Sequence, residues 1–176
     1  MVPKQYAWLL KEPGPKMLVE ALKHYGVKEI AGARNSPEIM AWADELGGNV
    51  RAVYQQDSTP WCGLFVAMLA HRAGKALPAS PLWARAWATW GTKSPQPQLG
   101  DVLVFLRKGG GHVGLYVGEN ATHYFVLGGN QSDGVNIKTR RKSELLAARR
   151  FYSIAPPANV RRIVLTAAGE PSVKED

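Results

Sequence analysis

The feature that most limits how this chain can fold is the segment 61–70, ten consecutive residues without a charged or strongly polar side chain. Thr59 suits the N-cap position before a helix, and Pro60 suits the first helical turn. Gly74 is placed to end such a helix. Because a helix that is apolar almost all round must be buried, we expect this one at the centre of the domain.

The segments around this helix divide the chain into a helical half and a strand-rich half. Helices are predicted over residues 15–25, 37–46, 80–91 and 143–147, and a loop over residues 49–58. Strands are predicted over residues 102–106, 112–117, 122–127, 135–138, 149–154 and 160–166, with a hairpin turn at 118–121. Helices followed by antiparallel strands predict an α+β domain.

The length, charge and cysteine content of the chain restrict the kind of protein that it can be. Its 176 residues fit one domain, which we place at residues 1–166 with its core at 15–155, followed by a flexible tail at 167–176. No stretch approaches the roughly 18 apolar residues of a membrane helix, and the first residues do not have the pattern of a signal peptide. The net charge of +8 favours anionic partners. A single cysteine excludes a disulfide framework and a cysteine-rich zinc site.

That single cysteine, Cys62, is predicted at the third position of the central helix. Free backbone amides and the helix dipole favour a thiolate at such a place. A lone cysteine is more often a small buried apolar residue, and that interpretation stays open here. Its place at a helix start favours the alternative, a nucleophile.

A nucleophilic thiol needs a base, and the sequence offers four histidines. His24 and His71 come near helix C-termini, where a surface histidine is common. His123 is expected across the hairpin from Tyr116, roughly 13 Å along the strand from His112. His112 follows three glycines and opens a strand, so it is the preferred base.

A third group should orient the base, and another should stabilise the oxyanion. The predicted hairpin pairs His112 with Leu127, and the glycines that follow let Asn130 turn towards the ring. Gln131 and Asp133 are the alternatives to Asn130. The oxyanion donors are expected to be the Cys62 amide and the side chain of Gln56 or Gln55.

Four segments, taken in order, resemble the CHAP and NlpC-type papain-like hydrolases, and most of all their short single-domain phage and prophage members. The segments are residues 57–66, 99–105, 111–118 and 127–133, and the resemblance covers roughly residues 15–155. It implies a papain-like α+β core with N-terminal helices on an antiparallel sheet. It also implies Cys62 and His112 as the catalytic pair, Asn130 as the third residue, and Gln56 as the oxyanion glutamine. Gln131 is a second auxiliary candidate.

The activity that this resemblance implies is hydrolysis of an amide bond in the peptide part of peptidoglycan, by a phage endolysin or a virion-associated lysin. A secreted antibacterial amidase effector and an inactive wall-binding module are the alternatives. We expect synthesis in the host cytoplasm, action on the wall after release, and a monomer. Neither a metal nor a cofactor is expected, since no calcium loop of alternating aspartates is present. The basic clusters at 138–142 and 149–150 carry no nucleic-acid motif and could face anionic envelope polymers.

Overall fold

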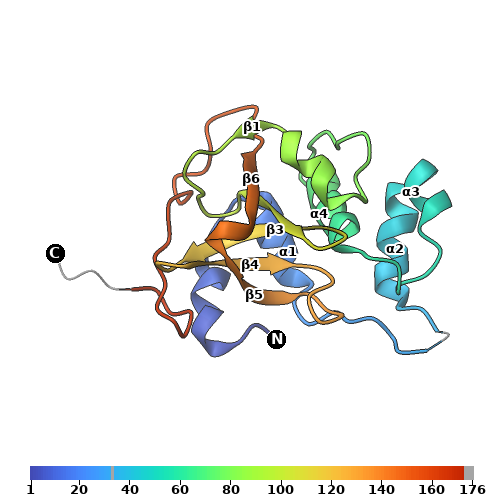
Figure 1. Ribbon diagram of the computed structural model, residues 1–176, viewed down its shortest axis with the longest axis horizontal. Coiled ribbons are helices and arrows are strands. Elements are labelled where there is room, and N and C mark those ends of the chain that lie inside the picture. The colour runs from blue at the N-terminus through green and yellow to red at the C-terminus, as the bar shows by residue number, and fades with distance from the viewer. Residues whose placement is uncertain (33, 173–176) are drawn as a thin grey trace.

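The computed structural model describes residues 1–32 and 34–172. Its helices are η1 (Lys4–Lys11), α1 (Lys16–Lys23), α2 (Pro37–Leu46), α3 (Gly48–Val53), α4 (Cys62–Arg72), η2 (Ala84–Thr89) and η3 (Lys142–Glu144), the η elements being 3₁₀ turns. Its strands are β1 (Thr92–Lys93), β2 (Val102–Arg107), β3 (Gly110–Glu119), β4 (His123–Gly128), β5 (Asn136–Arg141) and β6 (Leu145–Arg150). The predicted α+β architecture is therefore confirmed (Figure 1).

The strands form one antiparallel sheet in the order β1-β6-β2-β3-β4-β5. Three consecutive hairpin partners, β2 to β4, form its middle, and β6 returns to pair with the outer edge of β2. The aromatic rings of Phe105 on β2 and Tyr124 on β4 approach to 6.4 Å between centroids, although β3 lies between their strands. The sheet therefore curves so that side chains from non-neighbouring strands meet on this face.

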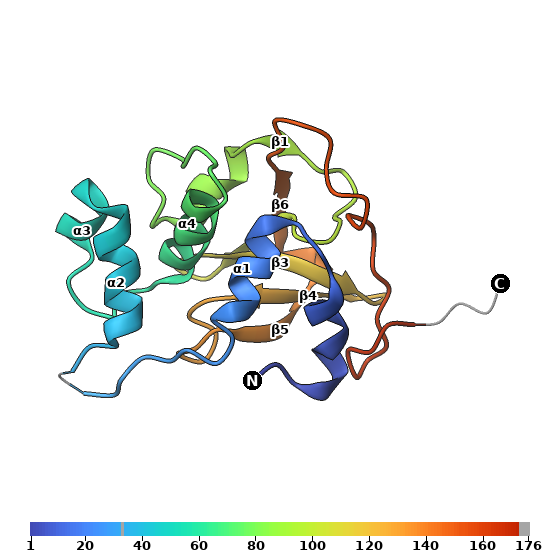
Figure 2. The ribbon, with the colours of Figure 1, turned by 180° about the vertical axis from the view of Figure 1, so that it is seen from behind.

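Helix α4 occupies the centre of the molecule, as its apolar sequence predicts. Every residue from 62 to 70 is buried. The helix packs against β3 and β4 on one side and against α1 and α2 on the other (Figures 1 and 2). Gly63 permits one close approach, because a Cβ atom there would lie 2.3 Å from the carbonyl oxygen of Leu82. The segment before η2 is thus held against the first turn of α4.

The start of α4 differs from the prediction. The helix begins at Cys62 and its N-cap is Trp61 (φ −118°, ψ 16°), so the cysteine is the first helical residue rather than the third. The preceding segment is held elsewhere: the Thr59 amide donates to the carbonyl of Gln56 at 3.1 Å. The buried Asp57 carboxylate accepts from a distant backbone amide, that of Ser36, at 2.7 Å. These contacts stop the helix from extending back through Pro60.

Other element boundaries also differ from the sequence prediction. Part of the predicted loop 49–58 forms helix α3, and the helix predicted over 80–91 is reduced to the 3₁₀ turn η2. The helix predicted over 143–147 is mostly strand β6, which pairs with β2 through Ala148 and Leu103. The strand predicted over 160–166 forms only isolated bridges at Val164 and Leu165. In the case of β6, pairing with a buried strand outweighs local helix propensity.

The predicted tail at 167–176 is described as far as residue 172, and residues 173–176 lie outside the described part of the chain. The amide of Ser172 donates to the carbonyl of Val164 at 2.9 Å. Gly169 lies against the ring of Tyr6, where a Cβ atom would come within 2.6 Å of the ring. The contact of Gly169 with Tyr6 connects this segment to the 3₁₀ turn η1.

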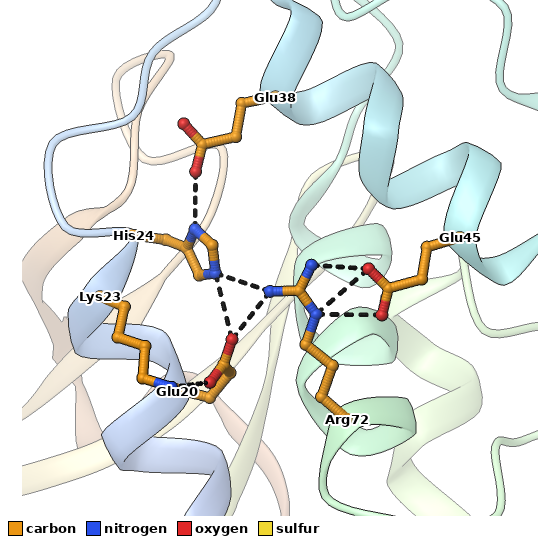
Figure 3. A network of polar contacts seen from close by, with 6 residues as sticks. All are labelled: Glu20, Lys23, His24, Glu38, Glu45 and Arg72. Carbon is orange, nitrogen blue, oxygen red and sulfur yellow. Dashed lines mark hydrogen bonds and ion pairs between the residues drawn. The ribbon is translucent and has the colours of Figure 1, made fainter.

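An ion-pair network joins the three helices α1, α2 and α4 (Figure 3). The guanidinium of Arg72 on α4 makes hydrogen bonds of 2.6–3.1 Å with both oxygens of Glu45 on α2. Its other amine lies 2.7 Å from Glu20 on α1. His24 extends the network to Glu38 at 2.6 Å. Although burial raises the pKa of Glu20, hydrogen bonds from Lys23, Arg72 and His24 lower it to about 2.

Substitution Arg72→Met is expected to lower the free energy of unfolding by about 2 kcal/mol, because it leaves two partly buried carboxylates without their shared partner. Lys23→Met is the matched control, since Lys23 contacts the same Glu20 but its side chain is 63% exposed, and we expect a loss below about 0.5 kcal/mol. Because the pKa of Glu20 is lowered on folding, its contribution is present above about pH 4.5 and is lost as the pH falls towards 2. Urea unfolding at pH 7 and pH 3 measures both effects, and equal losses for the two variants would contradict them.

Candidate active site

Cys62 lies at the start of α4 with its side chain turned towards the sheet, and only 7% of the residue is exposed. Backbone N–H groups of Val113 on β3 and of Gly63 point at the sulfur. Burial raises the pKa of the Cys62 thiol, and the two amides and the positive charge of Arg107 offset only part of this effect. The site therefore holds a neutral thiol at pH 7, next to the residue that follows His112.

His112 lies on β3, opposite Phe105 of β2, and is 1% exposed. The end of β4 passes against its ring, since a Cβ atom at Gly128 would lie 3.3 Å from Nε2. Burial, followed by the charge of Arg140, lowers the pKa of His112 to about 3, although the hydrogen bond that its ring donates to Gln131 acts in the opposite direction. The imidazole is therefore neutral at pH 7, and in the free protein it is a weaker base than an exposed histidine.

Gln131 fixes which nitrogen of His112 accepts a proton. Its Oε1 lies 3.1 Å from His112 Nε2. Its amide nitrogen donates to the carbonyls of Asn136 at 2.7 Å, Val126 at 3.1 Å and Gly128 at 3.4 Å. A flipped amide would place its oxygen against these carbonyls, so Oε1 must face the ring and Nε2 must carry the hydrogen. Nδ1 is then the free acceptor of the imidazole.

The ring partner is thus Gln131, one of the alternatives left open by the sequence, rather than the preferred Asn130. The hairpin register explains the difference, because Leu127 pairs with Leu115 instead of His112 after an irregularity between Tyr116 and Gly118. Asn130 has φ +53°, in the left-handed region, so the chain reverses there. The next side chain, that of Gln131, is the one that turns inwards and is buried.

The two candidate oxyanion glutamines are exposed and make hydrogen bonds within their own segments. Gln55 is exposed, and its side-chain amide donates to the carbonyls of Arg51 and Ala52 at the end of α3. Gln56 is also exposed, and its Oε1 accepts from the hydroxyl of Ser58 at 3.4 Å. The backbone amide of Cys62, at the start of α4, keeps the position expected of an oxyanion donor.

The remaining histidines are engaged or placed elsewhere. His24 belongs to the Arg72 network, and His71 is exposed in the last turn of α4. His123 begins β4, where its Nδ1 lies 2.8 Å from the hydroxyl of Thr122. The structure accordingly brings only His112 to the strand that borders Cys62.

A groove beside this pair was not predicted from the sequence. It is lined by residues 49, 50 and 53 of α3 and by residues 79–83. The side chains of Val53 and Trp83 are 65% and 71% exposed. Because the carbonyl of Leu82 contacts Gly63, the residue after Cys62, one end of the groove adjoins the first turn of α4.

The raised pKa of Cys62 predicts a particular pH dependence of thiol alkylation. Because the thiolate is the reactive form, the rate with iodoacetamide should rise through pH 9 without a plateau below it. The same chain in urea is the control, and there the rate should level off above the ordinary thiol pKa of about 8.5. A plateau near pH 6 for the folded chain would show instead that a thiolate is already present in the resting site.

The α+β fold is consistent with the class of papain-like cysteine hydrolases, in which a thiol at a helix start works with a histidine on a strand. Residues 54–130 match the family model of the CHAP domain, a segment that runs from the end of α3 to the turn after β4 and contains both Cys62 and His112. This match agrees with the resemblance to the CHAP family over residues 54–130. CHAP domains are cysteine peptidases and amidases, and the match implies a peptidoglycan substrate. No curated protein matches the chain, and no helix in the described residues is long and apolar enough to cross a membrane.

Proposed function

We propose that this protein hydrolyses an amide bond in the peptide part of peptidoglycan, with Cys62 as nucleophile, His112 as general base and Gln131 as the residue that positions the base. One observation carries this assignment: Gln131 Oε1 holds the Nε2–H of His112, which leaves Nδ1 free to accept a proton. The CHAP match supports the substrate class.

The mechanism starts from two neutral groups. The Nδ1 atom of His112 takes the thiol proton as the sulfur of Cys62 attacks the carbonyl carbon of the amide. The carbonyl oxygen becomes negative in the tetrahedral intermediate, and the Cys62 amide at the start of α4 donates to it. His112 then gives its proton to the leaving amine, and a thioester remains. Water, deprotonated by His112, cleaves the thioester to a carboxylate and restores the thiol.

Burial favours this general-base route over a preformed ion pair. The pKa of Cys62 is raised and that of His112 is lowered, so transfer of the proton before substrate binds is unfavourable on both sides. The proton must move as the carbon–sulfur bond forms. Bound substrate makes the proton transfer from Cys62 to His112 more favourable. The negative charge that develops on the carbonyl oxygen then stabilises the positive charge that forms on the imidazole.

The test is incubation of the full chain with purified peptidoglycan. An amide hydrolase releases new amino groups and leaves the number of reducing sugar ends unchanged. Mass spectrometry of the soluble fragments then shows whether the cut lies between sugar and alanine, within the stem peptide, or in a cross-bridge. Release of reducing ends without amino groups would contradict the proposal.

We further propose that the protein is a lysin of the phage endolysin or virion-associated kind, acting on the wall after its synthesis in the host cytoplasm. The net charge of +8 supports this role, because the bacterial envelope is anionic. Two residues of the predicted basic cluster, Lys138 and Arg141, are exposed on β5. Others are used internally, since Lys142 pairs with Glu119 and Arg150 with Asp101.

Lysis of whole cells should therefore fall steeply between about 0.05 and 0.5 M salt, because charges separated by more than about 10 Å are screened at 0.1 M. Hydrolysis of a short soluble peptide should change much less. The double variant Lys138→Gln/Arg141→Gln should lose part of the salt dependence on cells and keep the rate on the peptide. Equal salt dependence for both substrates would mean that the basic surface does not take part in binding the envelope.

A further inference from the structure

Two arginines on different strands lie on the same sheet face as His112. Residues alternate between faces along a strand, and directly paired residues share a face. Phe105 pairs with His112, so Arg107, two residues further along β2, shares the face of both. Arg140 of β5 pairs with Tyr124. The ring of Tyr124 lies 6.4 Å from that of Phe105, so the side chains of these two strand positions meet on one face of the sheet.

Both arginines lie within electrostatic range of the candidate catalytic pair. Burial has the largest effect on both groups, since it raises the pKa of Cys62 and lowers that of His112. The charge of Arg107 acts against the effect of burial on Cys62, and the charges of Arg140 and Arg107 lower the pKa of His112 further. Burial, followed by repulsion from Arg107, also lowers the pKa of Arg140 itself. The charge of Glu144 on η3 acts in the opposite direction and raises the pKa of Arg140. The two guanidinium groups thus remain close together at an unfavourable electrostatic cost.

Arg107 is exposed to solvent and Arg140 is partly buried, and neither is paired with a carboxylate of the described residues. Among residues 1–32 and 34–172, no ion pair within 4.0 Å involves Arg107 or Arg140. The Nε–H of Arg140 is buried and has no hydrogen-bond partner in that part of the chain. Arg150, by contrast, is similarly placed on a strand and is paired with the buried Asp101 at 2.7 Å. A buried donor without a partner is costly and rare, which points to an external acceptor.

We propose that Arg107 and Arg140 form a carboxylate-binding site beside Cys62 and His112, and that the preferred substrate is an amide with a free carboxylate within about one residue of the scissile bond. This inference rests on the proposed hydrolase function and names its substrate class. A guanidinium presents paired N–H groups that match the two oxygens of a carboxylate, and a shared carboxylate would relieve the repulsion between the two arginines.

Binding of the carboxylate would also prepare the base. The positive charges of Arg140 and Arg107 disfavour protonation of His112 in the free protein. A bound carboxylate compensates these charges, so the imidazole becomes a stronger base when the correct substrate is present. Substrates with the carboxylate should therefore gain in kcat as well as in KM.

The experiment compares two short acylated alanyl peptide amides that differ only in the next residue, glutamate or glutamine. With the unmodified chain we expect kcat/KM to be about 10- to 100-fold higher for the glutamate peptide, the range of one or two charge-assisted hydrogen bonds. Arg140→Gln and Arg107→Gln should remove most of this preference, because the rate on the glutamate peptide should fall relative to the rate on the glutamine peptide. Arg141→Gln and Lys108→Gln, which remove the same charge from neighbouring exposed positions, should keep it.

Binding to the Cys62→Ala variant, measured by calorimetry, separates this inference from the proposed function. If that variant binds the glutamate peptide more tightly than the glutamine peptide, and Arg140→Gln on the same background abolishes the difference, the carboxylate site is supported even when the unmodified chain cuts neither peptide. Equal binding of the two peptides, absence of binding, or a preference that survives both arginine substitutions would overturn it.

Discussion

Cys62→Ala is expected to reduce the release of amino groups from purified peptidoglycan by a factor on the order of 10⁴ or more, as loss of the nucleophile does in other hydrolases of this kind. The fold should be kept, because the side chain is small and the change removes a single sulfur atom. A melting temperature within a few degrees of the parent chain would show this. Cys62→Ser should be equally inactive, since a serine hydroxyl is much harder to deprotonate than a thiol.

The matched control for Cys62→Ala is Ser58→Ala, which changes an exposed side chain four residues earlier, before the helix. It should leave the rate within about twofold, the range expected for exposed positions away from a site. Full activity of Cys62→Ala with a native circular dichroism spectrum would show that the thiol has no part in the reaction.

Loss of the base should be nearly as severe. His112→Ala is expected to lower the rate by a factor on the order of 10³ to 10⁵, and the double variant Cys62→Ala/His112→Ala should be barely worse than either single variant, because the two residues act as a unit. His71→Ala and His123→Ala, at positions away from Cys62, serve as controls and should have mild effects. Additive losses in the double variant would indicate that His112 acts independently of the thiol.

The account of Gln131 predicts a smaller, separable effect. Gln131→Ala should lower kcat about 10- to 100-fold with little change in KM, because the ring loses both its orientation and a hydrogen bond that raises its pKa. Gln131→Glu should not restore the rate at pH 7, since its second oxygen would face the carbonyls of Val126, Gly128 and Asn136. Asn130→Ala changes the residue at the chain reversal and should lower the melting temperature more than the rate per folded molecule. Rates and melting temperatures of these three variants distinguish a positioning residue from a structural one.

The parts of the fold that could be predicted from sequence are those where local pattern and tertiary environment agree. The apolar run of residues 61–70 has no stable place except a core, and the structure confirms its burial. The helix predicted over 37–46 has the bounds of α2, because Ser36, Pro37 and Gly47 mark both of its ends. Strand β6 was misplaced because its pairing with β2 depends on residues far away in the chain.

The site was predictable in its residue types but not in its geometry. The only cysteine, and a histidine that follows three glycines, stand out in the sequence. The partner of His112 depends on an irregularity in the β3–β4 register and on three residues with positive φ, Asn130, Ser132 and Asp133. Neither feature leaves a clear trace in the sequence, so the choice among Asn130, Gln131 and Asp133 stayed open. The sequence alone could not assign Arg107 and Arg140 to one site, because their proximity depends on the curvature of the sheet.

The proposed mechanism requires that the sulfur of Cys62 form a covalent bond to the acyl part of the substrate. Mass spectrometry of the intact chain, quenched in acid during turnover of an activated ester or amide, tests it most directly. The account predicts an added mass equal to the acyl group, located on the peptide that contains Cys62, and absent from the Cys62→Ala variant. Turnover of the same substrate by Cys62→Ala at the parent rate, or an acyl group found on another residue, would contradict it.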